Sequence, residues 1–363
     1  MRRMELAESL HVDGYEEAVE MFYDRGWTDG LPVVLPTRKL VEAMVAASGR
    51  DAGESLGAIP PKNGEATIGK LAVNAVMGGC KPAHFPIVLA AFEAMMAPQH
   101  NLNGVTQTTH MCVSLTIVGG PIARKLNFNS RDGVFGNGYR SNGAVGRALR
   151  LALWNLGGAV PWATDMATMS HPGEYAFCIA EEQDDNPWDP LHVERGCAPG
   201  SDAVTVFACE GPHSVLCQGT PEEMLHVLTD SMSSLGNNNV HAGGQTLVVL
   251  NPLNAEEFAR RGWSKKDVRD YLWENSRRTL ADVKGCGIIH EGFRKAQVDV
   301  GRMHFRHNID SPKATVPVTN RPEDIHIVVA GGRTYFAAVL SGWGSFGGYA
   351  VTRPIPPSWT SKE

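Results

Sequence analysis

The sequence predicts an α/β fold made of two similar lobes with a cleft between them. Short apolar runs bounded by glycine and proline, typical of buried strands, alternate along the chain with segments of helical periodicity. A weak internal repeat supports two lobes, because Pro82 aligns with Pro221 and Pro121 aligns with Pro252. Both halves then read as helix, polar loop, strand, proline and helix, and a cleft between such lobes is a common ligand site.

In the first half, helices and strands are expected in a regular order. Asp13 is expected to cap a first helix, and Thr37 is expected to cap a second that ends near Gly49. Between these helices, glycines and prolines favour an extended arm. The remaining expected elements are a loop over 51–66, helices over 66–79 and 83–96, a strand over 113–118, a helix from Ala144 to Gly158, and a strand over 176–180.

The second half repeats this alternation of strands and helices. Ser264 is expected to cap the second of two short helices, and the segment from Asn237 to Gly244 reads as a polar loop. The other expected elements are strands over 203–211, 246–252 and 325–330, a helix over 221–235, and a loose tail from Pro354.

These elements predict three structural units in the chain. Residues 1–60 form an N-terminal arm, residues 61–200 a first lobe, and residues 201–363 a second lobe. The boundary is placed in residues 181–202, which are acidic and interrupted by prolines and glycines.

The amino-acid composition and the net charge indicate an ordinary globular protein. Hydrophobic residues make up 43% and charged residues 20% of the 363 residues, as in ordinary globular proteins. The net charge of −6 argues against nucleic acid as the main partner, since binding phosphates requires a basic face. No apolar run approaches the length of a membrane span, and the first residues lack the apolar segment of a signal peptide. A cytoplasmic protein without a membrane partner, without a cofactor and most commonly a homodimer is therefore expected.

The cysteines form neither a CxxC pair nor a zinc-ribbon spacing. Their number is odd and they are scattered through a long chain, so reduced thiols are expected. The seven are Cys80, Cys112, Cys178, Cys197, Cys209, Cys217 and Cys286.

A glycine-rich stretch, GVFGNGYRSNGAVGRALRLALWNLGG, is the strongest candidate for a binding loop. Glycines let a ligand approach the backbone, a helix start offers free N–H groups, and arginine provides a fork for carboxylate or phosphate. Arg140, Asn142 and Arg147 are therefore expected to bind an anionic group. The alternative is a tight loop whose arginines bind backbone carbonyls or surface carboxylates. Asp29 is expected either to orient one of these residues or to form a turn.

Three residues are candidates for catalysis. Cys80 lies before Lys81 and a helix start at Pro82, where positive charge favours a thiolate nucleophile. The alternative is a buried cysteine that fills a helix corner. His110 and His241 lie in loops just before corresponding strands of the repeat, where acid–base groups often collect.

A metal site is a competing interpretation. His304 and His307 share the i, i+3 spacing of one helical face, and His290 lies upstream. Two interleaved arginines argue against a cation there, and no HExxH motif is present.

Several blocks also resemble a known family. GWTDGLPVVLPT, VMGGCKPAHFPIVLAAFEAM, RSNGAVGRALRLALWNLGG and PEDIHIVVAGG resemble a largely uncharacterised bacterial family associated with the UGSC-family (seleno)proteins. The resemblance covers about residues 25–355 and implies an α/β fold with a thiol or redox association. The CGSC motif of those proteins is absent from this sequence.

Together these features predict an enzyme that acts on a small anionic organic substrate in a cleft between lobes. Cys80 would supply the thiolate and His241 or His110 would move protons. Two alternatives remain: a metal-dependent lyase or hydrolase that uses the histidine cluster, and a non-catalytic subunit that binds the ligand for a partner enzyme.

Overall fold

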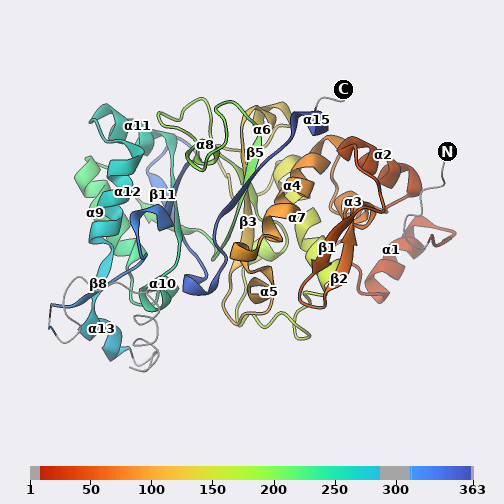
Figure 1. Cartoon of the computed structure of the whole chain (residues 1–363), viewed down its shortest axis with the longest axis horizontal. Coiled ribbons are helices and arrows are strands. Elements are labelled where there is room, and N and C mark those ends of the chain that lie inside the picture. Colours follow the sequence, from red (N-terminus) through yellow and green to blue (C-terminus); the bar gives the residue numbers. More distant parts are fainter. Residues whose placement is uncertain (1–8, 287–310, 312, 361–363) are drawn as a thin grey trace.

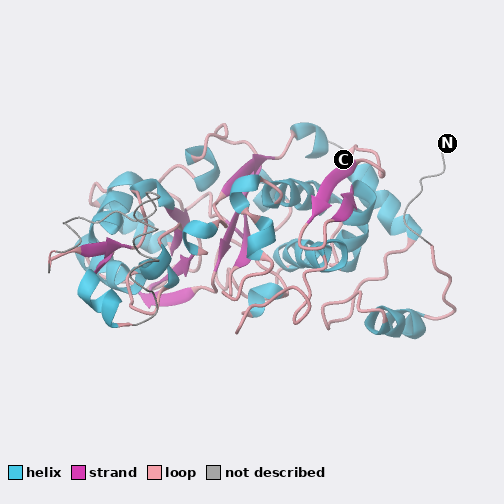
Figure 2. Cartoon of the chain, turned by 60° about the horizontal axis from the view of Figure 1, so that its bottom comes forward, coloured by secondary structure: helices cyan, strands magenta, loops and turns pink. Residues whose placement is uncertain are grey.

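The computed structural model confirms an α/β fold and describes residues 9–286, 311 and 313–360. Two four-stranded mixed sheets lie at the centre of the molecule, with helices outside them on both sides (Figures 1 and 2). The first sheet contains β3 (Val113–Gly119), β4 (Cys178–Ala180), β5 (Ala203–Cys209) and β12 (Val351–Pro354). The second sheet contains β6 (His213–Leu216), β7 (Thr246–Leu250), β10 (Ile325–Val329) and β11 (Phe336–Ser341).

The two sheets have the same internal arrangement. In the first sheet the order is β4-β3-β5-β12, with β4 parallel to β3 and the other neighbours antiparallel. In the second sheet the order is β10-β7-β11-β6, again with one parallel pair followed by antiparallel neighbours. The first sheet takes β5 and its edge strand β12 from beyond residue 200, whereas all four strands of the second sheet come from the continuous segment 213–341. A boundary at residue 200 does not separate the sheets.

The helices on the outer faces are also placed equivalently. Helix α4 (Phe85–Met95) packs on β5, β12 and β3, and α9 (Pro221–Met232) packs on β11 and β6. Pro121 and Pro252 each occupy the first turn of the helix that follows β3 or β7, namely α6 (Pro121–Lys125) and α11 (Pro252–Arg260). Helix α7 (Arg140–Ala152) packs beside α4 and β4, as α12 (Lys265–Asn275) packs beside α9 and β10. That the halves form two lobes remains a prediction, but their topologies correspond.

Apolar side chains fill the space between the sheets. Alternate residues of β3, β5 and β7 point inward, which is the period of a strand with two covered faces. Because these described strands meet in a packed core, the predicted cleft does not separate their facing surfaces. The shared core includes Val113, Leu115, Ile117, Phe207, Leu247, Val249, Val328 and Leu340.

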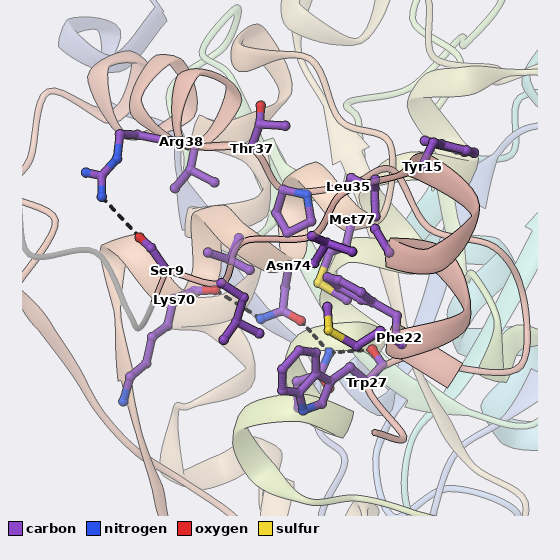
Figure 3. A pocket seen from close by; sticks show the side chains of 18 of the residues that line it. Ser9, Tyr15, Phe22, Trp27, Leu35, Thr37, Arg38, Lys70, Asn74 and Met77 are labelled. Carbon is purple, nitrogen blue, oxygen red and sulfur yellow. Dashed lines mark hydrogen bonds between the residues drawn. The ribbon is translucent and has the colours of Figure 1, made fainter. Parts of the chain in front are cut away.

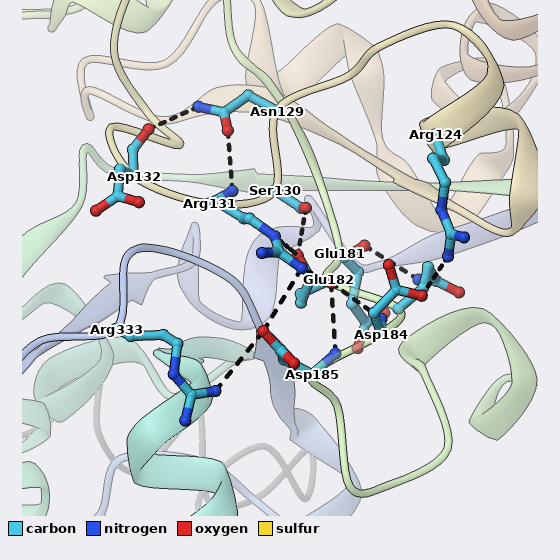
Figure 4. Close-up of polar contacts among 11 residues, drawn as sticks. Arg124, Asn129, Ser130, Arg131, Asp132, Glu181, Glu182, Asp184, Asp185 and Arg333 are labelled. Carbon is cyan, nitrogen blue, oxygen red and sulfur yellow. Dashed lines mark hydrogen bonds and ion pairs between the residues drawn. The ribbon is translucent and has the colours of Figure 1, made fainter.

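At the carboxyl ends of the parallel strands, a polar network joins the sheets (Figure 4). The Glu182 N–H donates to Val329 O at 2.8 Å, which links the end of β4 to the end of β10. The Glu182 carboxylate accepts from Ser130 Oγ at 2.7 Å and from Arg131 Nε at 3.0 Å. The acidic segment predicted as an inter-lobe boundary thus begins inside this junction, with Glu181 and Glu182 both buried.

Several expected elements differ in detail. Helix α1 (Tyr15–Asp24) begins after Gly14, without a side-chain cap from Asp13. Residues 51–66, predicted as a loop, include most of a hairpin of β1 (Ser55–Ile59) and β2 (Gly64–Thr67). The polar loop before β7 contains a short helix, α10 (Asn238–Ala242), because Asn237 caps it. The tail includes β12 and α15 (Pro357–Thr360).

Other helices end where the sequence predicts. The second helix, α2 (Arg38–Ser48), begins after Thr37, whose side chain makes no capping hydrogen bond, and ends at Gly49 in a left-handed conformation. Ser264 forms a capping box at α12. The remaining α-helices are α3 (Ile68–Met77), α5 (Leu102–Val105), α8 (Leu191–Glu194) and α13 (Leu280–Gly285), and the remaining strands are β8 (Arg277–Thr279) and β9 (Thr315–Pro317). A π-helical segment, η3 (Leu153–Gly157), extends α7, and a short 3₁₀ turn, η4 (Pro172–Glu174), precedes β4.

Candidate functional site

The glycine-rich stretch does not fold as the predicted anion loop. Helix α7 begins at Arg140 rather than near Ala144, and Tyr139 is its uncapped N-cap residue. A Cβ built at Gly146 would lie 2.6 Å from the Phe177 N atom, so this glycine permits close packing of helix against strand rather than ligand access.

The side chain of Asn142 forms hydrogen bonds with backbone groups. Its Nδ2 group donates to Asn129 O at 3.1 Å and to Cys178 O at 3.2 Å, while its Oδ1 accepts from the Asn129 N–H at 2.8 Å. The side chain is buried. Asn142 therefore ties the loop before α7 to β4, and its amide is not free to bind a substrate.

Arg147 and Asp29 bind each other. Arg147 Nε and NH2 reach the two Asp29 carboxylate oxygens at 2.9 and 2.7 Å, and further Arg147 bonds go to Pro32 O and Leu31 O. This is the backbone-carbonyl alternative of the sequence analysis, and it fastens the N-terminal arm to α7. Arg140 differs because it is exposed and its Nε donates only to Gly79 O among the described residues, at 2.9 Å.

Cys80 lies beside Arg140 but is buried. Burial raises the pKa of the Cys80 thiol far above its ordinary value, and the charge of Arg140 offsets only part of this effect. Desolvation therefore outweighs the positive charge that was expected to favour a thiolate, and the structure does not support Cys80 as a nucleophile.

His241 is a buried residue of α10 whose Nε2 lies 2.7 Å from Leu235 O.

Arg140 and Arg150 lie about 15 Å apart along α7, given the rise of a helix. Arg140 is beside Cys80, whereas Arg150 faces the region of His110. The structure thus divides the predicted catalytic residues among separate places instead of gathering them.

His110 lies in hydrogen-bonding contact with a carboxylate. Its Nε2 lies 2.7 Å from the Glu210 carboxylate, and both side chains are partly buried, with exposures of 19% and 26%. The pairing follows from the sheet, because His110 precedes β3 and Glu210 follows β5, its antiparallel neighbour. A carboxylate on one ring nitrogen fixes the proton there and leaves the other nitrogen as a base.

His171 lies next to this pair. A Cβ built at Gly211 would be 3.6 Å from the His171 ring, and the charges of His110 and Glu210 act on His171. His171 Nδ1 accepts the Gly173 N–H at 3.1 Å, so the proton of the neutral ring is on Nε2. Burial lowers the pKa of His171, which keeps the ring neutral at pH 7.

Arg150 adds positive charge from α7. Its guanidinium pairs with the Glu174 carboxylate, its Nε donates to Glu174 O at 3.2 Å, and its charge acts on His171 and Cys112. The Arg150 side chain is only 11% exposed. Helix α7, the segment before β3 and the loop before β4 therefore place Arg150, His110 and His171 at one end of the first sheet.

This region collects buried polar atoms without partners. Within the described residues, His110 Nδ1 and Ser170 Oγ make no hydrogen bond, and His171 Nε2 makes none of normal geometry, although the backbone of Cys209 lies close enough to act on the His171 ring. Ser170 also has a φ of 54°, an unusual conformation for a residue other than glycine. Unsatisfied buried groups and backbone strain are costly and are often found at functional sites. We call His110, Glu210, His171, Arg150 and Ser170 the His110 centre.

Sequence analysis identified His110 but missed the other members of the centre. Glu210 was part of a predicted strand, and its position at the end of that strand was the available signal. Arg150 was part of the predicted helix, and Ser170 and His171 were not considered. Antiparallel pairing of β5 with β3 brings these residues together, and pairing between distant segments is not visible in local patterns.

The alternative metal ligands His290, His304 and His307 lie outside the described residues. Within the described ranges, no group of three or more His, Cys, Asp and Glu side chains is arranged to hold a metal ion. Each described helix is too short or too polar to cross a bilayer.

Comparison of the chain with protein-family models, with curated proteins and with solved structures found no match. The resemblance to the family associated with UGSC proteins therefore stays a prediction.

Proposed function

We propose that this protein is an enzyme that transfers protons to and from a small anionic organic substrate at the His110 centre. The observation that carries the proposal is the 2.7 Å contact of His110 Nε2 with Glu210, together with the unpaired His110 Nδ1. Orientation by a carboxylate is how enzymes commonly prepare an imidazole as a general base.

The two histidines have complementary protonation. With its Nε2 proton directed at Glu210, His110 presents an unprotonated Nδ1 that can accept a proton from the substrate. His171 presents an Nε2–H that can donate a hydrogen bond to an oxygen on which negative charge develops. Arg150, paired with Glu174, places a guanidinium near His171 that can orient a carboxylate of the substrate. Base and donor are thus available on neighbouring side chains.

Solvent deuterium exchange tests the proposal without requiring a known product. The wild-type protein is incubated in D₂O with a panel of small carboxylic, hydroxy and keto acids, and incorporation is followed by NMR. Glu210→Gln and His110→Gln are expected to reduce the exchange rate by about 10²-fold or more, the usual contribution of a general base. His226→Gln, an exposed histidine on α9, is the control and should match the wild type.

Equal exchange rates in wild type, Glu210→Gln and His110→Gln would exclude the His110 centre as the catalytic site. Exchange by no member of the panel would favour the alternative of a non-catalytic binding subunit. Metal content measured on untagged protein addresses the third alternative, which depends on His290, His304 and His307.

A further inference from the structure

The N-terminal arm encloses a cavity of about 870 Å³ against the body of the protein. Helix α1 and the segment that follows it form one wall, and α2, α3 and η3 form the others (Figure 3). This volume is within the range of about 300–1,000 Å³ that is typical of small-molecule sites. The apolar lining includes Phe22, Trp27, Leu35, Val73, Met77 and Leu156.

The arm wall is held in place by hydrogen bonds to η3 and to the end of α3. Trp154 Nε1 donates to Gly26 O at 2.7 Å, and Asn155 Nδ2 donates to Trp27 O at 3.1 Å. The Val34 N–H donates to Met77 O at 3.2 Å. The paired Arg147 and Asp29 add a charged contact at the same segment. The cavity is therefore preformed, which lowers the entropic cost of binding a ligand.

The cationic side chains that line the cavity lie on one side of it, whereas the uncharged Asn74 and Asn155 lie near Trp27. Figure 3 shows Arg38 and Lys70 on one side and Phe22, Trp27 and Met77 on the opposite side. Arg38 NH2 donates to Ser9 Oγ at 3.1 Å, and its nearest described carboxylate, that of Glu42, lies at 3.8 Å. Among the described residues, Lys70 Nζ donates only to the backbone carbonyl of Glu65, at 2.8 Å.

We propose that this arm cavity binds an amphipathic anion, namely a carboxylate with a medium-length apolar chain. The chain would lie against the apolar side, where its burial removes hydrocarbon surface from water. The carboxylate would lie between Arg38 and Lys70 and would accept charge-assisted hydrogen bonds from their cationic groups. The inference does not depend on the His110 centre, since none of the residues of that centre lines the cavity.

Calorimetric titration of the full-length protein with dodecanoate, below its micelle concentration, tests the inference. Two analogues with the same chain serve as comparison ligands. Dodecanol has a neutral head group, and dodecyltrimethylammonium has a cationic one. The expected result is one dodecanoate bound per chain, at least tenfold more tightly than either analogue. Equal binding of all three would show that the head group is not recognised and would overturn the assignment of an anion.

Two variants separate the chain site from the head site. Val73→Trp fills the cavity and should abolish binding, whereas Val227→Trp, at an exposed position on α9, should not. Lys70→Met should weaken dodecanoate about tenfold without changing dodecanol, and Lys39→Met, an exposed lysine that does not line the cavity, is its control. Dodecanoate binding that survives both Val73→Trp and Lys70→Met would place the ligand elsewhere and overturn the inference. The Lys70 comparison decides the matter if Val73→Trp does not fold.

Discussion

Arg147 holds Asp29 through two parallel hydrogen bonds of 2.9 and 2.7 Å, across 118 positions of sequence. Both side chains are largely buried, with exposures of 17% and 8%. Arg147 also donates to two backbone carbonyls of the arm, Pro32 O and Leu31 O. An arginine that sequence patterns assign to substrate binding thus connects the N-terminal arm to the first sheet's helix layer.

Arg147→Lys should destabilise the arm. Lysine keeps the charge but loses the planar fork, and it leaves Asp29 without its two-point partner. We expect a loss of about 1–3 kcal/mol in the free energy of unfolding and faster amide hydrogen exchange in residues 27–36. Arg140→Lys is the control on the same helix, because Arg140 is exposed, and should stay within about 0.5 kcal/mol of wild type. Equal losses in the two variants would contradict this account.

Exposed cysteine thiols should react faster than buried ones. In the folded protein, Cys197 and Cys286 are partly exposed, whereas Cys80 and the others are buried. Ellman's reagent is therefore expected to label two thiols quickly and the rest only after unfolding, and Cys80→Ser should leave the fast phase unchanged. Rapid labelling that disappears in Cys80→Ser would restore the nucleophile hypothesis.

Glu181 should make the protein more stable at low pH than at high pH. Burial raises the pKa of this carboxyl to about 7, although Lys265 partly opposes the effect. The folded state then binds the proton more strongly than the unfolded state, so the stabilisation is complete below pH 4.5 and is lost as pH rises through 7. Across this window, wild type should lose up to about 3 kcal/mol relative to Glu181→Gln. Urea unfolding of both proteins at several pH values measures the difference in their free energies of unfolding. A difference that stays constant across these pH values would contradict the prediction.

The neighbouring Glu182 should behave oppositely. Burial by itself would raise the pKa of Glu182, but hydrogen bonds from Ser130 and Arg131 outweigh it and lower the pKa. Its stabilisation is therefore present above pH 4.5 and is lost as the pH falls further. Glu182→Gln should destabilise the protein at pH 7 and much less near pH 3, again by urea unfolding. A penalty that does not shrink on acidification would show that Glu182 acts through packing rather than charge.

Local signals predicted much of the fold. Thr37 and Gly49 bound α2, and Ser264 with Asp267 forms a capping box, because these residues act within a few positions of themselves. The continuous apolar run 113–118 became the central strand β3. Edge strands β6 and β12 were missed because their residues are partly exposed and β12 contains Pro354, so the patterns that mark buried strands are weak there.

The candidate site was less predictable than the fold. His110 was identifiable from its place before a strand, but Glu210 becomes its partner only through the register in which Val113 faces Cys209. Cys80 shows the opposite problem, since Lys81 and a helix start are visible in the sequence while burial of the thiol is not. Burial depends on the packing of distant segments and can outweigh neighbouring charge.

The position of β12 near the end of the sequence has a consequence for synthesis on the ribosome. Residues 113–209 supply three strands of the first sheet, but the fourth, β12, is translated more than 140 residues after β5 ends. Until then the outer edge of β5 has free N–H and C=O groups, which other chains can pair with. The first sheet therefore cannot be completed until the C-terminal part of the chain has been synthesised.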